Sequence, residues 1–164
     1  MKTLLVLRHA KSSWADSALD DHERPLNDRG ERQAPQVGEQ LIQRRLVPDL
    51  IISSDAVRAH MTADAVARAA GHSGEIRLDH SLYLAAPDDI LAVLRSADDN
   101  AGIVMVVGHN PGLEGLVGQL TGETASLATA TVAQIALPID RWRDLDESTL
   151  GRLSAVWRPD DTSS

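Results

Sequence analysis

Arginine and histidine side chains follow three short apolar runs of the sequence, and these residue types can bind and transfer phosphate. Arg8 and His9 follow the run LLVL, Arg58 comes shortly after LIISS, and His109 and Asn110 follow VMVVG. A guanidinium can grip a tetrahedral oxyanion with two hydrogen bonds. A neutral imidazole can attack phosphorus without a separate base beside it. The pattern therefore predicts a phosphoryl-transfer pocket, provided that the three runs end side by side.

Each of these residues taken alone has an ordinary explanation. A histidine after a strand is often only a hydrogen-bonded turn residue, and a single arginine is often an ion-pair partner or a solvated helix residue. Their coincidence at one sheet edge favours the functional interpretation. Either His9 or His109 could be the nucleophile; the other, if charged, would donate a hydrogen bond to a phosphoryl oxygen. This arrangement requires no metal and no cofactor.

The other candidate motifs are weaker. His22, His60, His72 and His80 lack neighbouring ligands at the usual zinc spacing, so we interpret them as surface or loop residues. The segment GHNPG lacks the lysine and the glycine spacing of a nucleotide-binding loop. The chain has no cysteine, which excludes disulfides, thiolate metal sites and a cysteine nucleophile.

Short apolar runs are expected to form the strands that position these residues. Runs without polar alternation are typical of strands covered on both faces. The last two runs are expected to pair as an antiparallel edge. The expected strands are 3–7, 50–53, a weak 76–78, 103–107, 131–137 and 150–157.

Helical spacing occurs between these runs. Asn27 could cap a helix over 28–45, although Pro35 suggests a bend or a start nearer Glu31. Asp55 is the expected N-cap of a second helix, whose inward positions would be Val57, Met61, Ala65 and Ala69. Further helices are expected over 87–94, with Ile90, Leu91 and Leu94 inward, and from Pro111 to Leu120.

The alternation of strands and helices predicts an α/β fold, a three-layer sandwich with a mostly parallel central sheet and helices on both faces. The length of 164 residues suits one domain, expected over 1–158, with a loose tail at 159–164. The net charge of −8 argues against nucleic acid and anionic lipid as partners. No apolar stretch predicts a signal peptide or a membrane span, so we expect a cytoplasmic protein, and a monomer.

Four segments together resemble the histidine phosphatase superfamily, whose fold is phosphoglycerate mutase-like, and more narrowly its phosphohistidine phosphatase SixA branch. They are LLVLRHAKSSW, ERPLNDRG, IISSDAVRAHMTA and VVGHNPGLEGL, and they occur in this order from Lys2 to about Leu120. The four segments jointly are far more specific than any one of them.

The resemblance implies a role for each matching residue. His9 would be the nucleophile that becomes phosphorylated, Arg8 and Arg58 would bind the phosphoryl oxygens, and His109 would be the second histidine of the pocket. Weaker assignments follow for three further residues. Ser12 would place a hydroxyl near the phosphate, Asn110 would be a secondary contact, and Arg24 would either steer the substrate or form a turn-stabilising ion pair.

Several residues depart from the family pattern. Ala10 replaces the usual glycine, and Ala15 replaces an asparagine common in the family. The segment that carries a glutamate acid in mutases and general phosphatases offers Leu84 here, with Asp88 only a guess. An alkoxide leaving group needs a proton donor, whereas a phosphoramidate needs less help, so the missing acid favours phosphohistidine as substrate.

Three alternatives stay open at this stage. The pocket could hydrolyse small-molecule phosphate esters, or return the phosphoryl group to a sugar acid as a mutase does. It could also belong to a module that binds phosphorylated ligands without turning them over. The expected partner is therefore a phosphorylated protein or a small-molecule phosphate.

Overall fold

The computed structural model describes residues 1–159, so the tail expected at 159–164 lies, apart from Pro159, outside the described residues. One six-stranded sheet runs through this part of the chain in the order β3-β2-β4-β1-β5-β6. All the strands expected from the sequence are present. They are β1 (Lys2–Arg8), β2 (Leu50–Ser54), β3 (Ile76–Asp79), β4 (Ile103–Gly108), β5 (Val132–Leu137) and β6 (Arg152–Trp157).

The sheet is parallel on one side of β1 and antiparallel on the other. β1 pairs in parallel with β4, and β2 pairs in parallel with both β4 and β3. β5 pairs antiparallel with β1, and β6 antiparallel with β5, as expected for the edge. Because β1, β2 and β4 are parallel, their carboxyl ends lie at one edge of the sheet, which is where open α/β sheets bind ligands.

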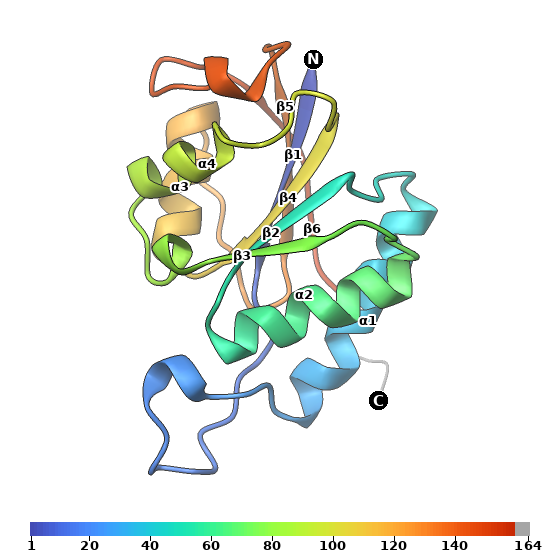
Figure 1. The fold of residues 1–164 in the computed structure, drawn as a ribbon, viewed down its shortest axis with the longest axis vertical. Coiled ribbons are helices and arrows are strands. Elements are labelled where there is room, and N and C mark those ends of the chain that lie inside the picture. Colours follow the sequence, from blue (N-terminus) through green and yellow to red (C-terminus); the bar gives the residue numbers. More distant parts are fainter. Residues whose placement is uncertain (160–164) are drawn as a thin grey trace.

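Helices cover both faces of the sheet, which confirms the three-layer α/β prediction (Figure 1). α1 (Asp28–Gln43) and α2 (Val57–Ala70) pack on one face, and α3 (Pro87–Leu94) and α4 (Gly112–Thr121) on the other. Successive residues of β1 point to opposite faces: Leu5 and Leu7 join the core beneath α1 and α2, while Leu4 and Val6 join the core beneath α3 and α4. A strand buried on both sides must be apolar throughout, which explains the run LLVL.

The expected start of α1 is confirmed, whereas the expected cap of α2 is wrong. α1 begins at Asp28, and the Asn27 side chain accepts a hydrogen bond from the Gly30 backbone N–H at 2.9 Å; Pro35 lies inside the helix, so the alternative start nearer Glu31 does not occur. α2 is preceded by Ala56, not capped by Asp55, whose carboxylate has other partners.

The buried face of α2 also differs from the expected one. Val57, Met61, Ala65 and Ala69 are only partly buried. The helix instead turns inward the residues Arg58, Ala59, Thr62, Ala63, Val66, Ala67 and Ala70. In an alanine-rich helix both faces have similar apolar periodicity, so spacing alone could not distinguish them. By contrast, Ile90, Leu91 and Leu94 of α3 are buried as expected.

Three short 3₁₀ segments complete the described fold, and two of them lie near the ligand-binding edge. η1 (Asp21–Glu23) lies in the long loop between β1 and α1, and η2 (His80–Leu82) follows β3; η3 (Trp142–Asp144) lies between β5 and β6. Within residues 1–159, none of the helices is both long and apolar enough to cross a membrane.

Candidate active site

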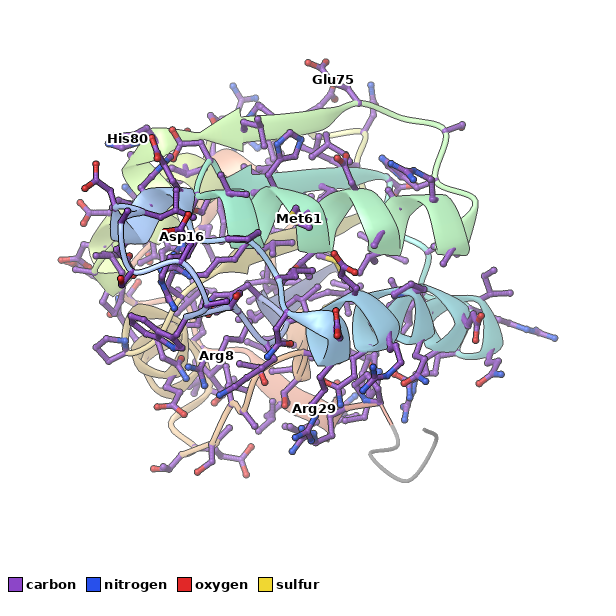
Figure 2. The ribbon with its side chains drawn as sticks, turned by 90° about the horizontal axis from the view of Figure 1, so that it is seen from below. Arg8, Asp16, Arg29, Met61, Glu75 and His80 are labelled. Atoms are coloured by element: carbon purple, nitrogen blue, oxygen red, sulfur yellow. The ribbon has the colours of Figure 1, made fainter. Side chains whose placement is uncertain are left out.

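All seven residues singled out from the sequence line one cavity of about 210 Å³ at the carboxyl edge of the sheet. They are Arg8, His9, Ser12, Arg24, Arg58, His109 and Asn110. The parallel register explains the convergence, because Arg8 pairs with Gly108 and the next residues, His9 and His109, emerge side by side with ring centroids 5.2 Å apart. Figure 2 looks onto this end of the molecule, where the loop carrying Asp16 crosses between Arg8 and His80.

The His9 imidazole is held with one ring nitrogen free for chemistry. Its Nδ1 lies 2.7 Å from the Ala10 carbonyl oxygen, which can only accept, so Nδ1 carries the proton. Nε2 then has the lone pair, and it accepts a 3.3 Å hydrogen bond from Arg58 Nε. Burial, reinforced by the nearby guanidiniums, lowers the pKa of His9 to about 4. His9 is therefore neutral near pH 7 and presents Nε2 to the cavity as a nucleophile.

Arg58 links the two histidines. Its NH2 group donates to His109 Nδ1 at 3.4 Å, so His109 Nε2 carries the proton and donates to Ser54 Oγ at 2.8 Å. Burial, then the proximity of His9 and Arg58, lowers the pKa of His109 to about 3. The second histidine is thus neutral in this structure, whereas the role considered for it from the sequence, as a donor to a phosphoryl oxygen, requires a charged ring. A phosphate dianion beside it would raise its pKa again.

Arg8 and Asn110 are both tied to the carbonyl of Leu127. Arg8 NH1 donates to this oxygen at 3.0 Å and Asn110 Nδ2 at 2.8 Å. The buried Arg8 Nε has no hydrogen-bond partner among the described residues. Burial lowers the pKa of Arg8 from its usual value, although Arg8 stays charged because arginine does not lose its proton in proteins. An unpaired buried guanidinium N–H is costly unless an anion accepts from it, which suits a phosphate-binding role.

Arg24 combines the two roles considered for it. It lines the cavity, and its Nε also donates to Asp21 Oδ1 at 3.2 Å, so it both faces the rim and forms an ion pair. Ser12 lies beside it in the lining, as does Lys11, which the sequence argument missed. The loop after β1 is fixed against α1, because a Cβ on Gly30 would lie only 2.2 Å from the Lys11 carbonyl oxygen.

Asp21 is a further missed residue, and it organises one wall of the site. Its Oδ2 accepts from Arg58 NH2 at 3.0 Å and from the Tyr83 hydroxyl at 2.5 Å, while its backbone carbonyl accepts from Arg58 NH1 at 2.7 Å. These bonds, first that from Tyr83, lower the pKa of Asp21 to about 2. Asp21 is therefore ionised at neutral pH and cannot act as a general acid. Its position in a polar loop gave no periodic signal in the sequence.

Two hydroxyl residues that the sequence argument also missed support the site from below. Ser54 Oγ accepts the hydrogen bond from His109 Nε2 that is described above. Thr62 Oγ1 donates to the Arg58 carbonyl at 2.7 Å and accepts from the Ala10 backbone N–H at 3.0 Å, so it joins α2 to the loop that carries His9. Both residues are fully buried. A serine at the end of a strand and a threonine within a helix carry no distinguishing pattern in the sequence.

His22 and His80 lack ligands at zinc spacing in the sequence, as expected, but the fold brings both of them to Asp55. Both donate to the Asp55 carboxylate, His22 Nε2 at 2.8 Å and His80 Nδ1 at 2.9 Å. One ligand atom from each of the three residues lies within 4.8 Å of the others, so in the described chain this is the set that could share a cation. They lie 33 and 25 positions from Asp55 in sequence, which no zinc-spacing rule anticipates. None of the three lines the phosphate cavity.

No carboxylate occurs among the described residues that line the cavity, and its charged members are all cations. They are Arg8, Lys11, Arg24 and Arg58. Leu84 stands in the lining where a proton donor could have been. Asp88, the guessed acid, is exposed in the first turn of α3 and is not part of the lining.

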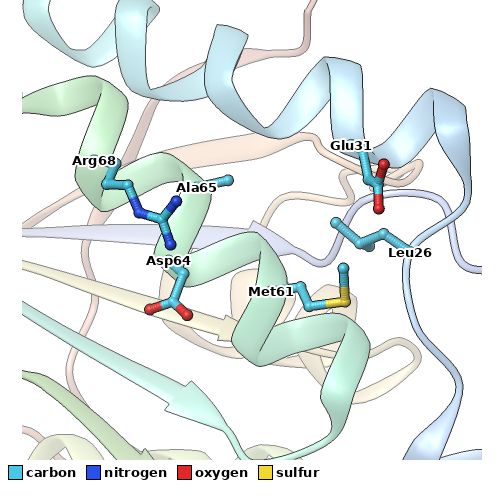
Figure 3. A pocket seen from close by; sticks show the side chains of 6 residues that line it. All are labelled: Leu26, Glu31, Met61, Asp64, Ala65 and Arg68. Carbon is cyan, nitrogen blue, oxygen red and sulfur yellow. The ribbon is translucent and has the colours of Figure 1, made fainter.

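A second hollow, of similar volume, lies between α1 and α2 (Figure 3). Its charged residues are Glu31, Asp64 and Arg68, so acidic groups outnumber basic ones, and no histidine lines it. An anion would be repelled there. Of these two cavities, only the first therefore suits the phosphate chemistry expected from the sequence.

Comparisons with known proteins agree with this geometry. The family model described as histidine phosphatase superfamily (branch 1) matches residues 4–83. A chloroplast protein of Arabidopsis thaliana, itself uncharacterized, is 32% identical over 152 residues, which cover 87% of this chain and 70% of that protein. The chain belongs to the histidine phosphatase superfamily.

Solved structures narrow the likeness to the SixA branch. A proposed phosphohistidine phosphatase SixA from Nakamurella multipartitia is 28% identical, with a TM-score of 0.84 and 96% of both chains covered. One from Agrobacterium tumefaciens is also 28% identical, with a TM-score of 0.81, covering 96% of this chain and 98% of that one. The resemblance to SixA proteins noted in the sequence is confirmed at the level of the whole fold.

Proposed function

We propose that this protein hydrolyses phosphohistidine, through a phosphorylated His9 intermediate and without a metal ion. The observation that carries the proposal is the state of His9, a neutral imidazole with its lone pair on Nε2, beside a cavity lined by cations and by no described carboxylate. Such a cavity attracts a phosphoryl dianion and offers it a nucleophile. The membership in the histidine phosphatase superfamily supports the same class of reaction.

In the first step the His9 Nε2 lone pair forms a bond to phosphorus, and the bond from phosphorus to the leaving nitrogen breaks. The bonding electrons stay on the leaving imidazole, which either is already protonated or takes a proton from solvent. Arg8 and Arg58 bind the phosphoryl oxygens throughout and stabilise their charge. Positioning and electrostatics supply most of the acceleration, as is general for phosphoryl transfer.

In the second step a water oxygen attacks phosphorus and the bond to His9 Nε2 breaks, which releases inorganic phosphate. His9 regains its lone pair, and Nδ1 keeps its proton because the Ala10 carbonyl accepts from it throughout. The phosphate dianion favours a proton on His109 Nδ1, which lies next to Arg58 NH2 in the free pocket. A protonated His109 then donates to a phosphoryl oxygen.

The choice of phosphohistidine rests on the leaving group. An alkoxide leaving from an ester needs a general acid, which is worth about 10²–10⁴ in rate. The cavity lining offers no described carboxyl group, and Asp21, which lies behind Arg58, cannot supply the proton because it is ionised. An imidazole needs no such donor, so phosphohistidine suits the site better than sugar phosphates do.

The same lining supports the proposal that no metal ion is needed. Four cationic side chains surround the cavity, and a divalent ion placed among them would be repelled at short range. The arginines already supply the positive charge that a metal provides in other phosphatases. The reaction therefore needs no ion at the phosphate.

Turnover of a phosphohistidine peptide, compared with phenyl phosphate, glycerol phosphate and a phosphorylated glycerate, tests the proposal. We expect kcat/KM to be highest for the phosphohistidine peptide, with free phosphate released. Efficient hydrolysis of the esters alone would show a general ester phosphatase. Transfer within the glycerate without phosphate release would show a mutase, and tight binding without any turnover a recognition module; each result would overturn the proposal.

A further inference from the structure

Two of the three exposed residues that line the phosphate cavity are large and apolar, and the third is Lys11. Trp14 and Leu84 both line the cavity, and both are largely exposed, at 74% and 59%. They come from separate segments, the loop after β1 and the turn between η2 and α3. Large apolar side chains exposed together at a ligand site are unusual enough to require an explanation.

Trp14 is held in place although it is exposed. Its ring lies against the Arg24 guanidinium, whose central carbon is 3.5 Å from the ring centroid. Arg24 is itself only 7% exposed and is fixed by Asp21 and by the Ser13 carbonyl, to which its NH1 donates at 3.4 Å. A buried cation thus anchors the indole by a cation–π contact while most of the side chain stays accessible.

Leu84 is held at a backbone cost. Its φ of +51° lies in the left-handed region, which is unfavourable for a residue with a Cβ. Its side chain is mostly exposed, so core packing does not repay this strain. The turn that carries it is pressed onto the start of α4, since a Cβ on Gly112 would lie 2.0 Å from the Ala85 carbonyl oxygen. Strain of this kind clusters at ligand sites.

We propose that Trp14 and Leu84 form a leaving-group subsite that takes a planar, largely apolar ring. The inference rests on the proposed function, and it identifies the ring as the imidazole of the substrate phosphohistidine. With in-line attack by His9 from the floor, the leaving group departs toward the mouth, where the indole offers a stacking surface. A polyhydroxylated leaving group placed there would lose water without gaining hydrogen bonds from these two side chains.

The test compares a substrate that has a ring with one that has none. Phosphohistidine peptide, free phosphohistidine and phosphoramidate share the P–N bond, but the leaving group of phosphoramidate is only ammonia. We expect Trp14→Ala to lower kcat/KM for both phosphohistidine substrates by about 3- to 10-fold, the usual worth of an aromatic contact, and to lower it much less for phosphoramidate. Equal losses on the peptide and the free amino acid place the contact at the ring; a loss on the peptide alone would place it on the flanking chain and overturn the proposal.

Three further variants separate the subsite from indirect effects. Trp14→Phe keeps a ring and should recover most of the loss. Leu84→Gly relieves the positive φ, so it should fold at least as well as wild type and still lose activity selectively on phosphohistidine. Leu150→Ala removes a side chain that is 68% exposed and distant from the lining, and it should change nothing.

The outcomes distinguish this inference from the proposed function. If Trp14→Ala lowers kcat/KM equally for all substrates, Trp14 acts only by supporting Arg24, and the subsite is refuted. If wild type hydrolyses only esters, the proposed function fails. The subsite is then still tested by the ratio of kcat/KM for phenyl phosphate to kcat/KM for glycerol phosphate. A ratio unchanged in Trp14→Ala and Leu84→Gly would refute it there as well.

Discussion

The carbonyl oxygen of Ala10 determines which nitrogen of His9 can react. A histidine in water exchanges its proton between both nitrogens, but a 2.7 Å hydrogen bond from Nδ1 leaves the lone pair on Nε2. The Ala10 N–H in turn donates to Thr62 Oγ1, and the Ala10 side chain is fully buried. Position 10 therefore acts through its backbone, which explains why alanine serves where the family usually has glycine.

The buried histidines should make stability depend on pH. His9 and His109 have pKa values of about 4 and about 3 in the folded chain, against 6.5 when exposed, so the unfolded chain binds more protons in between. Their contribution to stability is complete above pH 6.5 and is lost as the pH falls toward 4. Between pH 7 and pH 5 each histidine should account for about 1–2 kcal/mol of lost stability.

Urea unfolding of wild type and His109→Asn at pH 7 and pH 5 measures this term. The variant should lose about 1–2 kcal/mol less than wild type on acidification, because one depressed group has been removed. Equal losses in the two proteins would mean that His109 is not buried in its neutral form.

Asp21 should act as a positioning residue for Arg58. Asp21→Asn keeps the shape but removes the charge that orients the guanidinium, so we expect kcat to fall about 10-fold, the usual cost of a lost charge-assisted bond. KM should not rise, because the cavity becomes more positive. Asp20→Asn makes the same change at the preceding residue and should leave kcat and KM unaltered. A rise in KM at constant kcat would instead indicate that Asp21 only shapes substrate binding.

Among the elements, the strands could be predicted best, because burial on both faces leaves a plain apolar signature. The runs at β1 and β4 predict not only the strands but also the site, since parallel neighbours of equal register end together. Pro87 and the two aspartates after it marked the start of α3 correctly, as proline at a first turn usually does.

Other features depend on tertiary contacts that no local pattern encodes. The inward face of α2 is determined by its packing against α1 and the sheet. Asp55 does not cap α2, because its carboxylate binds His22 and His80 from distant segments. Trp14 and Leu84 reach the cavity from a loop and a turn, and Asp21 holds Arg58 from a 3₁₀ segment; these positions depend on the whole chain. The four-segment resemblance implied roles for the phosphate-binding residues and for Arg24, but it assigned none to Trp14, Asp21 or a substrate-binding Leu84.

The N-terminus of α1 offers a test at the scale of one element. Asn27→Ala removes the side-chain oxygen that accepts from the Gly30 N–H, so it should cost about 1 kcal/mol of unfolding free energy in urea. Asn27→Ser can rebuild the cap and should remain close to wild type. If both variants match wild type, the helix start is fixed by packing against Lys11 rather than by the cap.

For the whole molecule, a net charge of −8 surrounds a strongly cationic cavity. This net charge argues against nucleic acid as a partner, so anion binding has to be local. The absence of a nucleic-acid partner and the monomeric state stay predictions, which gel filtration and binding to a labelled duplex can check.

Activity should survive removal of metal ions. After dialysis against a chelator, turnover of phosphohistidine peptide should be unchanged within about 2-fold, because the arginines supply the charge that a metal would. An ion held at His22, Asp55 and His80 would lie outside the cavity lining, so Asp55→Ala should respond to the chelator as wild type does. Activity lost on chelation and restored by a divalent ion would indicate a metal hydrolase.

The most direct measurement traps the phosphorylated enzyme. Wild-type enzyme is mixed with a phosphohistidine peptide that carries labelled phosphate, and the reaction is quenched in alkali, where a phosphorylated histidine survives. The enzyme is then digested, and the position of the label on the enzyme is mapped by mass spectrometry. We expect label on His9, absent in His9→Ala, which should also have lost turnover. Label on His109, or full turnover by His9→Ala, would contradict the assignment of His9 as the nucleophile.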